Sequence, residues 1–219
     1  MYFLGDWKHP FSKEATSDLP FMVEGKTEAK VPTMRKVESF AVATADGATV
    51  VELPYQGGAL SMVVVVPAKA DGLGELEAKL DPARFDGWVK ALTPEKINLT
   101  LPKFEVNPAA SLALREVLVE MGMKLAFDAD RADFTRIANP PSPADRLVIS
   151  NVFHKAFVKV DEKGTEAAAA TAVMMARAGS APSAQPREIK VDRPFLFFLR
   201  DVPSNLVLFS GRVVDPTKK

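Results

Sequence analysis

The sequence predicts an α+β protein in which strands outnumber helices. Several apolar runs have the length of a strand and are separated by turn-forming residues, and two further strand patterns close the chain. A few other segments have the apolar spacing of a helix. The chain has 219 residues, of which 47% are hydrophobic, which is enough for one large domain or two small ones with a sizeable core.

The first group of strands is predicted to form an antiparallel meander. Residues 40–44 (FAVAT), 49–53 (TVVEL) and 60–66 (LSMVVVV) are separated by ADGA and PYQGG, which have the composition of turns. Residues 63–66 are apolar without alternation. This pattern is typical of a strand that is buried on both faces.

Helices are predicted in three places. One covers residues 73–80, and the next covers 81–92, with Asp81 as its cap and Pro82 in the first turn. A third is predicted over residues 110–121, where the apolar residues recur at helical spacing.

The remaining strands are predicted from alternation and from apolar runs. Residues 97–106 alternate, and Pro102 indicates a break or an edge within them. Residues 152–161 alternate as well, and residues 195–199 and 206–214 are strong strand patterns at the end of the chain. No internal repeat is found in the sequence.

Composition excludes several classes of function. The 28 basic and 28 acidic residues cancel, so electrostatic attraction to nucleic acid does not dominate. The absence of cysteine excludes disulfides and thiolate metal sites, and the two histidines, His9 and His154, argue against zinc catalysis and a histidine-based triad. No apolar run approaches the ~20 residues of a membrane span. No phosphate loop, nucleophile motif or metal-ligand cluster indicates an enzyme, and no cofactor or metal is expected.

The most informative segment is the alanine-rich run EKGTEAAAATAVMMARAG, residues 162–179. Alanine favours a helix, but Gly164 near the start favours a hinge. The run also lacks the broad stripe of large apolar residues with which a helix packs on a core. The residues themselves therefore leave open an exposed helix and a segment selected for something other than static packing.

The alanine-rich run and the strand before it resemble a known family. NVFHKAFVKVDEKGTEAAAAT, residues 151–171, is similar to the last strand of the central sheet and the proximal hinge of the reactive loop in serpins. Further segments resemble serpin segments in the same order: FLGDWKHPF (3–11), VPTMRK (31–36), LPKFEV (101–106), MGMKLAFDADRADFTRI (121–137), DRPFLFFLRD (192–201) and VLFSGRVVDP (207–216). The resemblance covers essentially the whole chain, and the hinge is its most specific part.

The resemblance implies a multi-sheet, serpin-like α+β fold over residues 1–219, incomplete because helices and first strands of the family would precede Met1. Expected features are a central sheet strand, an antiparallel, barrel-like C-terminal sheet and an exposed reactive loop at about 163–187. We expect residues 38–66 and 193–214 to form one antiparallel sheet packed on the helix at 110–121. Residues 151–162 should form a long strand of a second sheet.

The function implied by the resemblance is inhibition of serine proteases by conformational trapping. The protease cleaves the loop and forms an acyl-enzyme, and the loop then inserts into a sheet as a new strand. The truncated chain is expected to be disabled in trapping and at risk of loop–sheet self-association. A non-inhibitory serpin that binds or carries a ligand, or an inactive fragment, is the alternative. The family implies an extracellular location, although residues 1–11 do not have the pattern of a signal peptide.

The resemblance also implies which residues of the loop carry the function. The hinge comprises Gly164, Thr165, Glu166, Ala167, Ala168, Ala169, Ala170 and Thr171. Alternate residues from Thr165 onward begin small, so they can enter a sheet without a large steric barrier. The scissile bond is either Arg177–Ala178, which implies trypsin-like proteases, or Ala178–Gly179, which implies elastase-like ones.

Four further residues match serpin positions where the central sheet opens. Trp7 matches the breach, where insertion begins, although the residue alone is equally consistent with a core aromatic. Glu162 and Lys103 match a breach ion pair, although by themselves they would be two solvated charges. His154 matches a hydrogen-bonded histidine of the shutter and is expected to be a satisfied core histidine.

Overall fold

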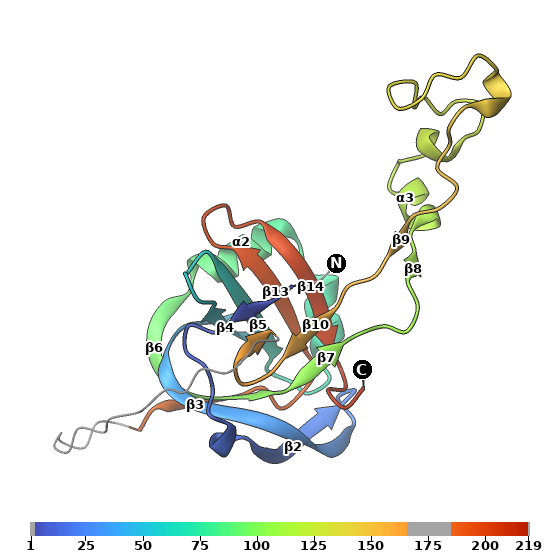
Figure 1. Cartoon of the computed structure of the whole chain (residues 1–219). Coiled ribbons are helices and arrows are strands. Elements are labelled where there is room, and N and C mark those ends of the chain that lie inside the picture. Colours follow the sequence, from blue (N-terminus) through green and yellow to red (C-terminus); the bar gives the residue numbers. More distant parts are fainter. Residues whose placement is uncertain (1–2, 166–184, 219) are drawn as a thin grey trace. The chain divides into compact units, whose positions relative to one another are not determined.

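The computed structural model describes residues 3–165 and 185–218, which belong to two compact units (Figure 1). The smaller unit is Asn107–Phe157, and the larger one combines Phe3–Val106 with residues 158–218. The smaller unit contains β8 (Leu112–Ala113), α3 (Arg115–Glu120), β9 (Phe153–His154) and the 3-10 turns η2 (Leu125–Phe127) and η3 (Pro143–Asp145).

The larger unit contains most of the regular structure. Its early elements are β1 (Gly5–Asp6), the 3-10 turn η1 (Lys13–Ala15), β2 (Ser17–Val23), β3 (Thr27–Ala45), β4 (Ala48–Pro54), β5 (Leu60–Pro67), α1 (Leu73–Ala78) and α2 (Pro82–Lys90). Its later elements are β6 (Thr93–Pro102), β7 (Phe104–Val106), β10 (Val158–Val160), β11 (Gly164–Thr165), β12 (Arg187–Lys190), β13 (Phe195–Asp201) and β14 (Val207–Val213).

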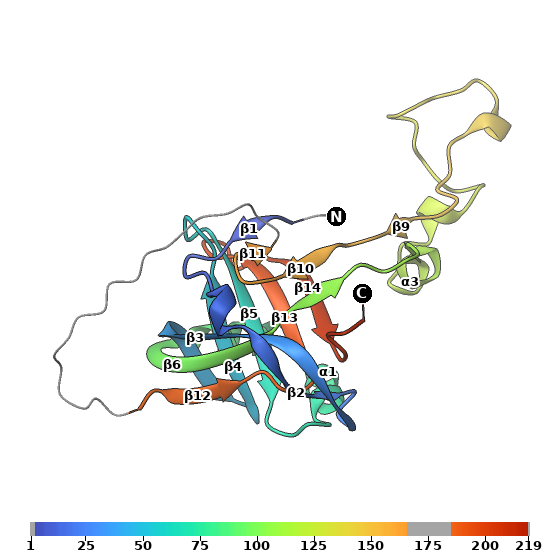
Figure 2. The same ribbon diagram turned by 60° about the horizontal axis from the view of Figure 1, so that its bottom comes forward.

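One eight-stranded sheet organises the larger unit. Its order is β12-β6-β3-β4-β5-β13-β14, and β2 pairs with β3 beside this path. The pairs are antiparallel except for β12 on β6, which is parallel (Figure 2). The predicted antiparallel sheet of residues 38–66 and 193–214 is therefore confirmed. Among the described strands, β12 and β14 end the order without pairing with each other, so the sheet is open and the barrel-like closure is not confirmed.

Strand β5 is buried on both faces, as its uninterrupted apolar run predicted. Val64 and Val66 belong to one hydrophobic cluster, and Val63 and Val65 belong to another. Because successive side chains of a strand point to opposite faces, each half of the run fills a different core. The sheet is thus the middle layer between two apolar cores.

Helices α1 and α2 cover one of these two faces. Leu76 of α1 and Phe85 and Trp88 of α2 pack with Leu196 and Phe198 of β13 in the second cluster. Helix α2 begins as predicted, because the Asp81 side chain accepts a hydrogen bond from the Arg84 amide at 2.7 Å and Pro82 occupies the first turn.

The prediction of a helix over residues 110–121 is wrong for about half of that range. Its first part is strand β8, only Arg115–Glu120 is helical, and α3 has no buried residue. Leu112 and Met121, which were expected to pack on the sheet, are 60% and 78% exposed. Helix α1 begins soon after β5 and α2 soon after α1, and these short connections bring the apolar residues of both helices onto the sheet instead.

The strand predicted over residues 97–106 breaks where Pro102 indicated. Strand β6 ends at Pro102, and β7 begins at Phe104. Strand β6 pairs with β3, whereas β7 pairs with β10. The chain therefore changes partners at Lys103, whose amide still donates to the Pro32 carbonyl at 2.9 Å.

The prediction of one long strand over residues 151–162 is also wrong. Two short strands occupy this stretch: β9 pairs with β8, and β10 pairs with β7. Residues 107–111 between β7 and β8 form no strand, and Pro108 among them has no amide hydrogen to contribute to a ladder. Because the partner is interrupted there, the ladder along 151–162 is interrupted as well.

Candidate functional site

The candidate site is the turn that joins β10 to β11, where the hinge begins. The Asp161 amide donates to the Gly164 carbonyl at 3.0 Å, and the Lys163 amide donates to Asp161 Oδ1 at 2.9 Å. Gly164 has a φ of 149°, and a Cβ atom placed on it would lie 2.1 Å from the Gly5 carbonyl oxygen. Only glycine fits this backbone conformation and this close approach.

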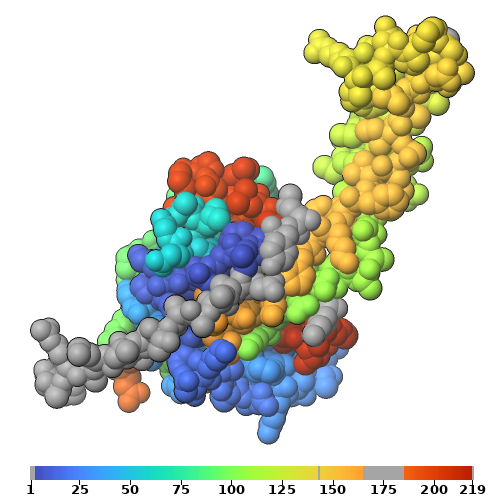
Figure 3. Space-filling model, in the orientation of Figure 1, coloured from blue at the N-terminus to red at the C-terminus, as the bar shows by residue number. Residues whose placement is uncertain are grey.

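The hinge turn is followed by strand pairing with the start of the chain. Asp6 lies opposite Gly164 and Gly5 lies opposite Thr165 in an antiparallel register. The Trp7 amide adds a hydrogen bond to the Lys163 carbonyl at 2.8 Å. In Figure 3 blue residues near the N-terminus and orange residues are visible on the same face of the molecule. Thus the first residues after the turn already form a short strand.

Trp7 supports the turn from within the core. Its side chain is only 3% exposed, and its indole stacks on Tyr55 with ring centroids 4.5 Å apart. The indole Nε1 donates to the Asp161 carbonyl at 3.0 Å. Trp7 is therefore both a core aromatic and a direct contact of the turn.

Glu162 and Lys103 form the predicted ion pair. Lys103 Nζ lies 3.0 Å and 2.9 Å from the two carboxylate oxygens, and Thr16 Oγ1 donates to Glu162 Oε1 at 2.9 Å. The Glu162 side chain is 6% exposed, whereas that of Lys103 is 37% exposed. This pair joins the hinge to the break between β6 and β7.

The ion pair determines the charge state of Glu162. Burial raises the pKa of the carboxyl, but hydrogen bonds from Lys103, from the backbone and from Thr16, together with the lysine charge, outweigh burial. The pKa of Glu162 therefore lies below its ordinary value. Glu162 is a buried anion at neutral pH.

Beyond the alanine-rich run the chain pairs with the large sheet again. Strand β12 pairs with β6, and Arg187 at its start reaches two neighbouring strands. One guanidinium nitrogen lies 3.3 Å from Glu95 Oε2, and the other donates to Thr44 Oγ1 at 3.1 Å. Residues 166–184 thus separate two anchored points of the same unit.

Comparison with known proteins identifies the family of this chain. The family model described as Serpin (serine protease inhibitor) matches residues 1–216. The chain belongs to the serpin family. Human Serpin B3 is 39% identical over 220 residues, covering 99% of this chain and 54% of that protein. The human leukocyte elastase inhibitor is 35% identical over 224 residues, covering 99% of this chain and 57% of that protein.

Solved serpin structures confirm the mixed α+β, multi-sheet arrangement. Native tengpin, a thermophilic serpin, has a TM-score of 0.84 at 28% identity, covering 98% of this chain and 54% of that one. Thyroxine-binding globulin in complex with thyroxine has a TM-score of 0.83 at 27% identity, covering 99% and 55%. The chain spans about half the length of the serpins it matches. Members of the family are mainly protease inhibitors rather than enzymes.

His154 differs from its prediction. It lies in β9 of the smaller unit and is exposed, not a buried core histidine. Its ladder partner is Leu112, which is 60% exposed, so this two-residue ladder has no core beneath it. Trp7, Lys103 and Glu162 come together in the larger unit, and His154 does not belong to that unit.

The remaining predicted serpin residues lie outside the described part of the chain. They are the hinge residues Glu166, Ala167, Ala168, Ala169, Ala170 and Thr171 and the reactive-bond residues Arg177, Ala178 and Gly179. Sequence reasoning missed Thr16 and Tyr55. Thr16 is 146 residues from Glu162 along the chain, so no local pattern connects them.

Residues 3–165 and 185–218 contain neither a metal-binding cluster nor a membrane-spanning helix. Within these ranges no group of three or more His, Cys, Asp or Glu residues is arranged to hold a metal ion. No helix in the same part of the chain is long and apolar enough to cross a membrane.

Proposed function

We propose that this chain carries the reactive loop and hinge of an inhibitory serpin, which traps a serine protease after the loop is cut. The observation that carries the proposal is the pairing of Gly164 and Thr165 with β1. A loop that is to become a strand needs a place where pairing begins, and these two residues supply it beside Trp7. The leukocyte elastase inhibitor, a relative, is a protease inhibitor by name.

The sequence after the hinge supports insertion over static packing. Thr165, Ala167 and Ala169 alternate along the chain and have small side chains. In an extended segment these residues share one face, so they can enter between packed strands with little steric resistance. Large or charged residues at the same positions would favour a non-inhibitory serpin.

The proposed scissile bond is Arg177–Ala178 or Ala178–Gly179. Arginine before the bond suits trypsin-like proteases, which hold it by charge pairing in their specificity pocket, and alanine suits elastase-like ones. Mass spectrometry of separate trypsin and elastase digests locates the cut. Cleavage only beyond Ser183 would contradict both assignments.

The polypeptide of residues 1–219 by itself is proposed to be cut without trapping. Trapping needs a strand partner on each side of the inserted loop. In the described residues β1 offers a pairing of two residues and β10 is three residues long. A cleaved loop would therefore gain few ladder hydrogen bonds, too few to hold a displaced protease.

The test is to mix the 219-residue chain with trypsin and with elastase and to look for a covalent complex on a denaturing gel. Loop cleavage without a complex, and a complex once the chain is fused to the part of a related serpin such as Serpin B3 that it does not match, support the whole proposal. A stable complex from residues 1–219 would refute the expected loss of trapping. Cleavage without a complex in the fused protein would refute the inhibitory function and favour a carrier, the role suggested by the thyroxine complex of a structural neighbour.

A further inference from the structure

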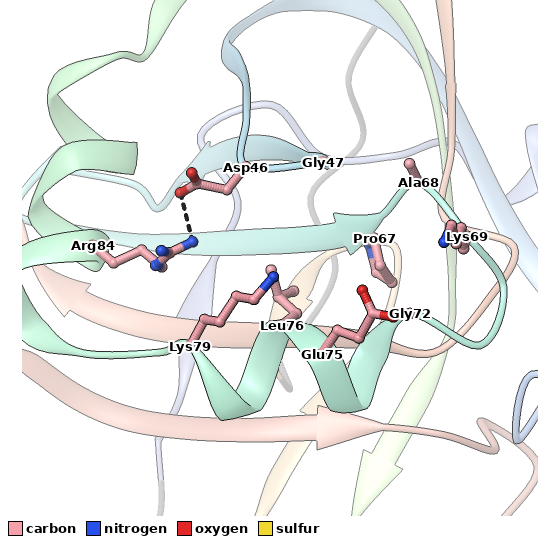
Figure 4. A pocket seen from close by; sticks show the side chains of 10 residues that line it. All are labelled: Asp46, Gly47, Pro67, Ala68, Lys69, Gly72, Glu75, Leu76, Lys79 and Arg84. Carbon is pink, nitrogen blue, oxygen red and sulfur yellow. Dashed lines mark ion pairs between the residues drawn. The ribbon is translucent and has the colours of Figure 1, made fainter.

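A small pocket lies where β5 ends and α1 begins, away from the hinge residues (Figure 4). Its volume is about 140 Å³. The β3–β4 turn at Asp46 and Gly47, the residues after β5, helix α1 and Arg84 of α2 form its walls. All of these elements belong to the larger unit. The pocket is therefore built within one compact unit of the fold.

The floor of the pocket is apolar and closely packed. Pro67 and Leu76 are buried, and both line the pocket. Gly72 in the wall is packed closely against residues 67–69. A Cβ atom at Gly72 would lie 3.2 Å from the Lys69 carbonyl oxygen and 3.2 Å from the Pro67 side chain. The pocket opens to solvent, and its volume is close to the roughly 150 Å³ of a cavity that holds one benzene molecule. The space thus suits one ring or a short acyl chain.

The acidic residue of the β3–β4 turn is already engaged by the protein. Asp46 Oδ2 accepts a hydrogen bond from Trp88 Nε1 at 3.0 Å and lies 3.0 Å from a guanidinium nitrogen of Arg84. In Figure 4 this pair forms the side of the pocket opposite Lys69. Asp46 and Arg84 therefore offset each other and leave little charge for a ligand.

Two lysines and one glutamate set the remaining charge of the pocket. They are Lys69, Lys79 and Glu75, so the residual charge is positive. Within the part of the chain that the structure describes, neither lysine has a carboxylate oxygen within the 4.0 Å of an ion pair. Figure 4 shows the Lys79 side chain extending from α1 toward the middle of the pocket. A ligand can therefore meet an ammonium group without displacing an existing partner.

We propose that this pocket binds a small organic monoanion, a carboxylate on one ring or on a short acyl chain. The apolar part would rest on Leu76 and Pro67, and the carboxylate would face Lys79 and Lys69. Binding would combine the burial of one apolar ring with one partly exposed ion pair. These two contributions together give weak binding that depends on salt. This site is independent of the loop and of the proposed inhibition.

The experiment titrates the 219-residue chain with benzoate and with its neutral isostere benzamide, followed by backbone amide shifts in NMR. Benzoate should shift the amides of Gly47, Gly72 and Leu76, and benzamide should bind about five-fold more weakly, the factor that corresponds to one partly exposed ion pair. Binding of both compounds with equal affinity, or shifts confined to other residues, would overturn the proposal.

Matched variants separate charge from shape. Lys79→Gln should weaken benzoate binding about two- to five-fold, and Glu75→Gln should strengthen it, because each changes one charge at the pocket. Lys90→Gln removes an exposed charge of α2 outside the pocket and should leave binding unchanged. Amide spectra of the free variants verify the fold. If Lys79→Gln binds benzoate as tightly as the unmodified chain does, the lysine has no role and the proposal is wrong.

Discussion

Removing the Glu162 carboxylate tests whether charge holds the hinge in place. The carboxylate accepts two hydrogen bonds from Lys103 and one from Thr16. Breaking a fully buried ion pair costs about 3–5 kcal/mol, and an exposed pair contributes about 0.2–1 kcal/mol. Here the Glu162 side chain is 6% exposed and the Lys103 side chain 37% exposed. The contribution of this pair to stability is therefore expected between these two limits. We expect Glu162→Ala to lower the free energy of unfolding by about 2 kcal/mol, because a freed Lys103 can regain water.

Urea denaturation followed by the fluorescence of Trp7 and Trp88 measures this loss, since both tryptophans lie in the larger unit. A double-mutant cycle with Lys103→Met isolates the pair, with an expected coupling of about 1 kcal/mol. As a matched control, Glu188→Gln breaks an ion pair with Lys190 in which both side chains are more than half exposed. A coupling below about 0.3 kcal/mol, or a loss no larger than that of the control, would refute the reasoning.

Three more predictions concern pH, the hinge glycine and the core. The pKa of Glu162 is lowered in the folded chain. Its contribution to the free energy of unfolding is therefore complete above the ordinary carboxyl pKa of about 4.3, and it is lost as the pH falls through the lower pKa of the folded chain. The stability difference between the unmodified chain and Glu162→Gln should thus be constant from about pH 7 to 5 and shrink below about 4.5 in denaturation curves; a difference that grows in acid would contradict this. Gly164→Ala should destabilise the chain more than Gly47→Ala, because both have positive φ but only the first Cβ would meet backbone atoms; equal losses in urea would count against it. Phe198→Ala should cost about 3–5 kcal/mol, and a loss under about 1 kcal/mol would show that the face covered by α1 and α2 is loosely packed.

Much of the eight-stranded sheet was predictable because its signals are local. The turn between β3 and β4 contains Asp46 and Gly47, and both have the positive φ angles, 54° and 74°, that a tight hairpin with right-handed strand twist requires. The run of valines in β5 indicated burial on both faces by its composition alone. The break after Pro102 followed from the missing amide hydrogen of proline.

The errors arose where a segment depends on a distant partner. Residues 151–162 have the alternation of one strand, but their pairing depends on β7 and β8, which an interruption near Pro108 separates. The exposure of His154 follows from the same short ladder.

The candidate site likewise contains some features that the local sequence predicts and others that depend on distant partners. The Glu162–Lys103 pair joins residues 59 positions apart, and only the resemblance to serpins indicated it. Nothing local indicated Thr16, which lies 146 positions from Glu162. Gly164 was identifiable as a hinge from its residue type, but the carbonyl of Gly5 that makes glycine necessary there could be identified only from the fold.

Separate sets of contacts hold the residues on either side of positions 166–184. On one side the hinge is fixed by Gly164 and the Glu162 ion pair, and on the other β12 is fixed by its ladder with β6 and by Arg187. The contacts of both anchors come from described residues outside 166–184. Closing a loop of twice the length costs only about 0.6 kcal/mol more, so insertions and substitutions between the anchors have little effect on the stability of the body. Under the proposed function, substitutions between the two anchors would change the target protease while the sheet, the cores and the turn at Gly164 remain as they are.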